Sequence, residues 1–230
     1  MNDNELDYID RGLSHLWLGK YEEAIVEFNK AIEINPNYEI SYNFRGTAYG
    51  SLGKFEEAIQ DYKKALELDP NSAETYKMFC SVCFKLEKLN DIIEYSTKSI
   101  KFNPNFSTAY ILRGNAYVRL NKYNETLKDF NKAIELDPND AEAYLARGTY
   151  YGFVSNPEKA VVDLAKAIKI NPNHSKAYSQ RGIAYGNLKN YSQAIKDFNK
   201  AIELDPNDME AILCREVTYM RINKNRHQNF

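Results

Sequence analysis

The chain has 230 residues, a formal net charge of −2 and an isoelectric point near 6. This charge balance excludes the basic surface that is typical of proteins binding a phosphate backbone. No apolar run reaches the roughly 18 residues needed to span a bilayer, and the acidic start lacks the features of a signal peptide. Three cysteines are too few for a disulfide framework. These features predict a soluble cytoplasmic protein that binds neither nucleic acid nor membrane.

A strict repeat organises the chain. The thirteen residues at 128–140 recur unchanged at 196–208, and looser copies recur every 34 residues. Each copy closes with Asn-Pro or Asp-Pro, at Pro36, Pro70, Pro104, Pro138, Pro172 and Pro206. Such a period is typical of stacked helical units. With the proline as position 32, the repeats are 5–38, 39–72, 73–106, 107–140, 141–174 and 175–208.

Each repeat is predicted to contain two helices, as the second repeat illustrates. Residues 39–52 have apolar and small residues at helical spacing, and the pair Gly53-Lys54 supplies a stop. Residues 55–68 repeat the helical pattern and end before Asp69-Pro70, because proline cannot continue a helix. In the fifth repeat Asn156-Pro157 predicts a capping residue followed by proline at the first helical position.

Small residues recur at positions 8, 20 and 27 of the repeats, and aromatic residues at positions 4, 11, 17 and 24. Glycine and alanine let two helices approach closely while the aromatic rings fill the remaining volume. After the sixth repeat, residues 209–223 predict one further helix that covers the last repeat as a cap. Residues 224–230 have no pattern and are predicted to form a flexible tail.

This pattern resembles the tetratricopeptide repeat over residues 5 to about 223, essentially the whole chain. The resemblance implies an all-α, right-handed superhelical solenoid, here a single domain of residues 1–223. It also implies that the first helices line a concave groove, which in this family usually holds a peptide or helix of another protein. The carboxylate clamp of the family's co-chaperones is not matched, because Ile9, Leu13 and Phe44 stand at clamp positions.

An internal comparison of the repeats predicts a buried ion pair. Position 7 is arginine and position 23 is acidic in five repeats, and the third repeat loses both, with Phe79 and Tyr95 instead. We predict a pair within each repeat, replaced in the third by an aromatic contact, because burying one partner alone would cost about 3–5 kcal/mol. The third repeat also has Ile92 for alanine and Ser96 for an aromatic residue. Two interpretations of these substitutions are open. The first is sequence drift in which the changes of side-chain volume compensate one another, and the second is a weak point at which the stack of repeats opens locally.

The candidates for chemistry are weak. Cys80 and Cys83 form a CxxC, but structural zinc needs four ligands, and these cysteines occupy mid-helix core positions. The three histidines form no cluster with a nucleophile and an acid, and there is no glycine-rich phosphate loop. The sequence therefore predicts no enzyme activity, no catalytic residue, no cofactor and no metal.

We expect a scaffold or adaptor that binds a protein or peptide in its concave groove. A self-assembling homo-oligomer is the alternative, and an RNA-binding solenoid is disfavoured by the charge balance. Packing against neighbouring helices is an equal explanation for the apolar members of the groove. The predicted groove residues are Ile9, Leu13, Trp17, Asn43, Phe44, Thr47, Lys77, Ser81, Ile111, Asn115, Arg119, Leu145, Thr149, Ser179 and Ile183.

Overall fold

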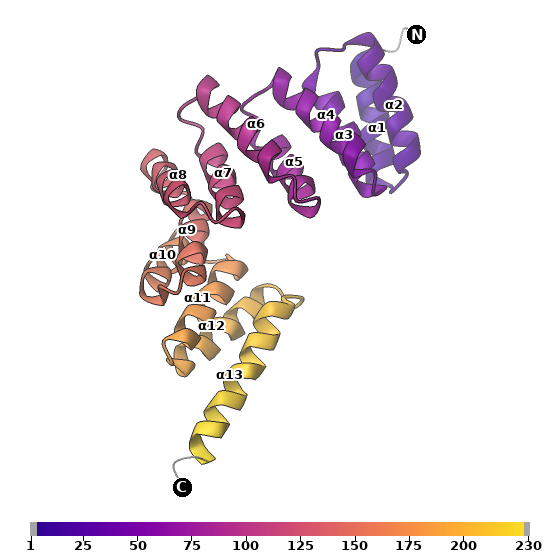
Figure 1. Cartoon of the computed structure of the whole chain (residues 1–230). Coiled ribbons are helices and arrows are strands. Elements are labelled where there is room, and N and C mark those ends of the chain that lie inside the picture. The colour runs from indigo at the N-terminus through magenta and orange to yellow at the C-terminus, as the bar shows by residue number, and fades with distance from the viewer. Residues whose placement is uncertain (1–3, 228–230) are drawn as a thin grey trace. The chain divides into compact units, whose positions relative to one another are not determined.

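The computed structural model describes residues 4–227, which form thirteen α-helices and contain no strand (Figure 1). The predicted all-α class is therefore confirmed for this range. The helices are α1 Glu5–Trp17, α2 Tyr21–Ile34, α3 Glu39–Ser51, α4 Phe55–Leu68, α5 Ala73–Lys85, α6 Leu89–Phe102, α7 Ser107–Arg119, α8 Tyr123–Leu136, α9 Ala141–Phe153, α10 Pro157–Ile170, α11 Ser175–Asn187, α12 Tyr191–Leu204 and α13 Met209–His227.

Every repeat consists of two helices whose ends follow the predicted signals. In the second repeat α3 is capped by Leu52, and Gly53 has φ +75°, a left-handed conformation that glycine adopts without strain. In the fifth repeat the Asn156 side chain accepts a hydrogen bond from the Lys159 backbone N–H, and Pro157 is the first residue of α10. The turn residues of the sequence thus determine where the helices begin and end.

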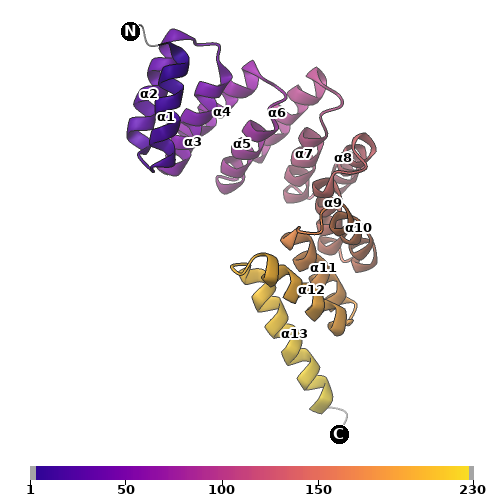
Figure 2. The ribbon, with the colours of Figure 1, turned by 180° about the vertical axis from the view of Figure 1, so that it is seen from behind.

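The helices group into two compact units, residues 1–122 and 123–230. The boundary falls inside the fourth repeat, so α7 belongs to the first unit and α8 to the second. Within the first unit α1, α3, α5 and α7 each contact the next, and within the second unit α9, α11 and α13 do the same. The first helices of successive repeats therefore form an inner layer in each unit, and the second helices form an outer layer (Figures 1 and 2).

Close approach of the two helices in a repeat requires the glycine at position 8. A Cβ atom added at Gly12 would lie 2.5 Å from Cε1 of Phe28, and one added at Gly46 would lie 2.9 Å from Cε1 of Tyr62. The aromatic residue at position 24 thus occupies the space that a side chain at position 8 would need. The predicted pairing of small and aromatic residues is observed in these contacts.

The predicted ion pair within a repeat is present. Arg45 donates to both carboxylate oxygens of Asp61, at 2.8 and 2.6 Å, which joins α3 to α4. The same guanidinium donates to Oδ1 of Asn29 in the preceding repeat at 2.7 Å. Hydrogen bonding to the acidic partner raises the pKa of Arg147 and of Arg181 above its usual value. The first, fifth and sixth repeats have the corresponding pairs Arg11–Glu27 at 2.9 Å, Arg147–Asp163 at 2.7 Å and Arg181–Asp197 at 2.7 Å.

The third repeat replaces this ion pair by the predicted aromatic contact. The rings of Phe79 and Tyr95 have centroids 5.3 Å apart, and the Tyr76 hydroxyl donates to the Tyr95 carbonyl at 2.7 Å. Cys80 and Ser96, which stand for the usual glycine and aromatic residue, are both buried. The two helices of this repeat approach each other less closely than those of the first, second, fifth and sixth repeats.

The last helix, α13, is longer than predicted. It ends at His227 and not at residue 223, so residues 224–227 are helical and do not belong to a tail, whereas 228–230 lie outside the described residues. The helix continues the repeat numbering: Ala211 at position 3 is buried, and Arg215 at position 7 donates to Oδ1 of Asn199 at 3.1 Å. It packs on the sixth repeat as a further first helix. Across the part of the chain that the structure describes, no helix combines the length and apolar character that a membrane crossing requires.

Candidate partner-binding surface

The inner layer places the predicted groove residues in three different environments. Helix packing buries Ile9, Ile111, Leu145 and Ser179. Leu13, Asn43, Phe44, Thr47, Asn115, Thr149 and Ile183 are half-buried, and Trp17, Lys77, Ser81 and Arg119 are exposed. The residues at position 5 therefore belong mainly to the packing between helices, whereas those at position 13 reach solvent.

Two apolar residues of the predicted groove belong to the core between the first two repeats. Leu13 and Phe44 pack on a buried cluster formed by Ala24, Phe28 and Ala48. The rings of Phe28 and Phe44 are stacked with centroids 6.1 Å apart. A polar substitution at Leu13 or Phe44 would damage this core, so neither position can test ligand binding alone.

The first repeat exposes large apolar side chains. Trp17, the single tryptophan of the chain, has 87% of its surface exposed at the last position of α1. Leu6, on the first turn of α1, and Leu18, which caps the helix, are also exposed. Such residues are costly to leave in water, and clusters of them mark surfaces where partners dock.

In the second unit the inner layer contains an apolar pocket between α11 and α13. Its volume is about 200 Å³, and its lining is mainly apolar. Asn187 and Arg221 are among the lining residues, so polar groups accompany the apolar surface. The lining residues are Ile183, Gly186, Asn187, Phe198, Leu213, Cys214, Val217, Thr218 and Arg221.

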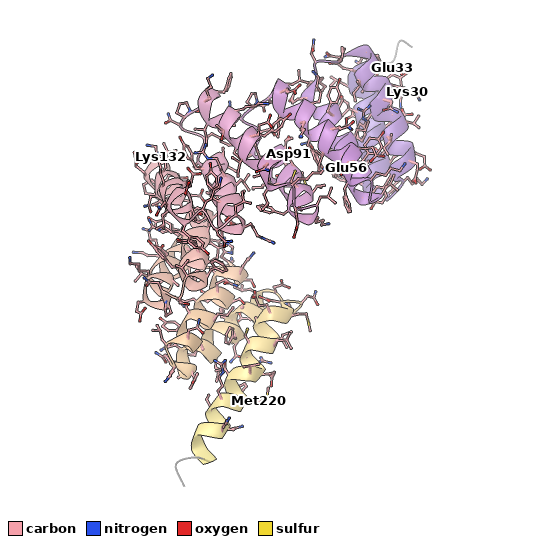
Figure 3. All side chains as sticks on the ribbon, viewed as in Figure 1. Lys30, Glu33, Glu56, Asp91, Lys132 and Met220 are labelled. Atoms are coloured by element: carbon pink, nitrogen blue, oxygen red, sulfur yellow. The ribbon has the colours of Figure 1, made fainter. Side chains whose placement is uncertain are left out.

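Sequence reasoning missed the contribution of α13 to this pocket, because it treated the last helix only as a cap. Leu213 is 60% exposed and Met220, on the C-terminal half of α13 (Figure 3), is 63% exposed. Applying the repeat numbering to α13 puts Leu213, Val217 and Met220 at positions 5, 9 and 12, all of which face inward in the family's geometry. That numbering was the signal that could have found them.

A second, more polar depression lies where α5 meets α6. It has a volume of about 400 Å³ and includes Lys88, Asp91 and Leu120. Lys88 pairs with Glu56, and Asp91 accepts a hydrogen bond from Lys63 at 2.9 Å. Both charged groups are thus occupied by contacts to α4.

The CxxC pair lies in the core of the first unit. Cys80 and Cys83 are buried, and burial raises the pKa of Cys83 to about 12 and that of Cys80 further. Thiols with so high a pKa are poor nucleophiles and poor metal ligands. Among the described residues no group of three or more His, Cys, Asp or Glu side chains is arranged to hold a metal ion.

The repeat architecture and its inner layer define a class of protein. Three models of the tetratricopeptide repeat match the sequence, at residues 40–72 and 175–208, at 12–53 and 114–152, and at 141–174. The matches cover more than half of the chain, which therefore belongs to the tetratricopeptide repeat family. They leave out residues 73–113, which contain the divergent third repeat. No curated protein matches the sequence.

Solved structures are similar over most of the chain. YrrB, described as a TPR protein with an unusual peptide-binding site, is 26% identical, with a TM-score of 0.52 over 82% of this chain and 97% of that chain. MamA is 25% identical, with a TM-score of 0.52 over 90% of this chain and 94% of that chain. A tetratricopeptide repeat protein from Parabacteroides merdae, 20% identical, has a TM-score of 0.72 over 94% of this chain and 84% of that chain, a likeness of fold.

Proposed function

We propose that this chain is a non-enzymatic scaffold that binds a peptide or helix of a partner protein on the inner layer of its repeats. The pocket between α11 and α13 carries the proposal. A small apolar concavity with a few polar groups in its lining is the kind of site that takes an anchoring side chain of a partner. Leu213, which lines the pocket and is 60% exposed, would be buried by such a partner.

Similarity to YrrB supports the same class of ligand. The two chains are 26% identical over most of both lengths, and YrrB is described as having a peptide-binding site. Membership of the tetratricopeptide repeat family supports a role as an interaction scaffold. Neither comparison identifies the partner, so the experiment uses a cell lysate and no preselected ligand.

The experiment is a pull-down from a lysate of source cells with wild type and Leu213→Glu. Val162→Glu is the matched control, because Val162 is an exposed apolar residue on the outer helix α10 of the same unit. We expect wild type and the control to capture the same protein, and Leu213→Glu to capture at least about tenfold less, since a charge would enter the apolar pocket. Circular dichroism verifies that each variant is folded. Equal capture by all three proteins would contradict the proposal.

Self-assembly is the second candidate, and the exposed apolar residues of α13 favour it. Leu213, Val217 and Met220 would also be covered if a second copy packed against this helix. Light scattering separates the two functions. An oligomer of wild type that becomes a monomer in Leu213→Glu, with no partner captured, would replace the scaffold function by self-assembly.

A further inference from the structure

Three cationic side chains lie on the inner layer of the first unit, in its third and fourth repeats. Lys77 and Lys85 stand at positions 5 and 13 of α5, and Arg119 stands at position 13 of α7. All three are exposed, and α5 contacts α7 directly. We call Lys77, Lys85 and Arg119 the basic strip. It occurs in a chain whose net charge is −2, so its sign opposes that of the whole protein.

Comparison with the other repeats sets the basic strip apart. Position 5 is uncharged in every other repeat and in α13. At this position Ile9, Ile111 and Leu145 are apolar and buried. Only the third repeat has a charge there, at Lys77. The same repeat has exchanged its ion pair for Phe79 and Tyr95. Its core is thus rebuilt from apolar groups, while its inner surface has become cationic.

The three cations differ from nearby lysines in having no carboxylate partner among the described residues. Lys63 is paired with Asp91, and Lys88 with Glu56. Around the basic strip, the single carboxylate at an inward position of these two repeats is Glu74, at the opposite end of α5 from Lys85. Lys63 and Lys88 are therefore neutralised within the chain, whereas the three cations of the basic strip are left for a ligand.

Aromatic rings lie beneath two of the cations. The guanidinium of Arg119 lies over the ring of Phe84 at 5.9 Å from its centroid, and Nζ of Lys85 lies over the ring of Phe55 at 5.3 Å. These contacts hold the two charges near the end of α5 without neutralising them. The surface therefore offers fixed positive charge beside half-buried apolar rings.

We propose that the basic strip binds an acidic peptide segment of a partner protein, an inference that rests on the scaffold function above and specifies the chemistry of its ligand. Lys77 and Lys85 are eight residues apart on α5, a rise of about 12 Å. An extended peptide covers that distance in about four residues. The matching ligand therefore has carboxylates about four residues apart and a side chain between them that packs on the rings.

An acidic peptide fits the basic strip better than a nucleic acid does. A phosphate backbone is contacted by a long run of cations, and the strip has three, in a chain of net charge −2. Inward positions 2, 5 and 9 of the second repeat are Ile40, Asn43 and Thr47, which continue the surface with apolar and neutral polar groups. A peptide uses such groups, whereas a phosphate chain does not.

The test uses three synthetic dodecapeptides of identical sequence, which have four Glu, four Gln or four Lys at the same positions, with two of these positions four residues apart. Binding to the full chain is measured by isothermal titration calorimetry. We expect the Glu peptide to bind at least about tenfold more tightly than the Gln peptide, and the Lys peptide to bind least. The affinity for the Glu peptide falls when salt rises from about 50 to about 300 mM, because exposed charges are screened.

The variant Lys77→Glu/Lys85→Glu locates the site. Its matched control is Lys64→Glu/Lys101→Glu, which makes the same change of charge at exposed lysines on the outer helices α4 and α6. We expect the first variant to lose affinity for the Glu peptide by about tenfold or more and the control to lose little. Because all four lysine side chains are exposed, we expect circular dichroism to show that both variants are folded.

Equal affinity for the Glu and Gln peptides, or equal loss in the variant and its control, would overturn the acidic-peptide assignment. Tighter binding of a twelve-residue oligothymidylate, abolished by Lys77→Glu/Lys85→Glu, would overturn it in favour of nucleic acid. None of these results bears on the scaffold function, which is tested separately by the variant Leu213→Glu in the second unit. Failure at Leu213 with retained binding of the Glu peptide would leave this assignment standing alone.

Discussion

The second and third repeats hold their helices together by different means. In the second, Gly46 lets α3 approach Tyr62 of α4, and Arg45 pairs with Asp61 across the same interface. In the third, Cys80 and Ser96 stand at the close-contact positions, and the rings of Phe79 and Tyr95 replace the ion pair. The comparison teaches that the repeat tolerates a different interface when both partners of a contact change together.

The third repeat is not a gap in the core of the first unit. Its buried residues Tyr76, Phe79, Ile92 and Tyr95 belong to one apolar cluster that extends to Tyr62 of the second repeat. This apolar cluster is what drift with compensating volumes predicts, and the weak-point alternative is tested by the reactivity of its cysteines. The helices lie further apart, yet large side chains fill the space between them.

The largest effect is expected from breaking the ion pair of the second repeat. Asp61→Ala would leave the half-buried Arg45 guanidinium without its carboxylate, at a cost of about 3 kcal/mol in the free energy of unfolding. Arg45→Phe/Asp61→Tyr, which transplants the pair of the third repeat, should recover much of that loss. Urea unfolding followed by circular dichroism measures both. A double variant no more stable than Asp61→Ala would show that the two interfaces are not interchangeable.

A smaller effect is expected at the close contact of the same repeat. Gly46→Cys introduces a side chain whose Cβ would lie 2.9 Å from the ring of Tyr62, which should cost about 2 kcal/mol. Adding Tyr62→Ser, as in the third repeat, should cost less than the sum of the two single changes, by about 1 kcal/mol.

Gly50→Ala is the control for this substitution, because a Cβ there meets nothing closer than 4.0 Å. Gly50 is helical, in the last turn of α3, so replacing it by alanine should leave the free energy of unfolding unchanged or raise it by up to about 1 kcal/mol. Strict additivity of Gly46→Cys and Tyr62→Ser, or equal damage at Gly50, would break the assignment of the close contact.

The smallest effect concerns the thiols. Burial raises the pKa of all three thiols, but Cys80 and Cys83 are fully buried, whereas Cys214 is half-buried and lines the pocket between α11 and α13. In the folded protein near neutral pH, a maleimide should react with Cys214 at least about tenfold faster than with either cysteine of α5. Mass spectrometry of the peptides measures the three rates. Similar labelling rates at the three cysteines would mean that the third repeat opens locally, as the weak-point interpretation predicts.

Much of the architecture was predictable because it depends on local signals that recur. Proline at position 32 and the capping residues set the helix ends, as at Asn156 and Gly53. The joint loss of Arg and acid in the third repeat predicted the contact of Phe79 with Tyr95, because a charge cannot be buried alone. These inferences needed no knowledge of how distant helices pack.

The binding surface was less predictable. A helical position alone does not say whether an apolar side chain faces a neighbouring helix or solvent, so Phe44 and Trp17 were indistinguishable until packing placed one in the core and left the other exposed.

The sequence by itself therefore determined the period, the all-α class, the helix boundaries within repeats and the pairing of side chains inside each repeat. All of these follow from contacts between residues close in the chain or from positions that repeat. Only the tertiary structure decided which inward positions remain open, that α13 runs to His227 and that it forms a pocket with α11. The physical reason is that exposure depends on what a neighbouring helix covers, and no local pattern encodes that.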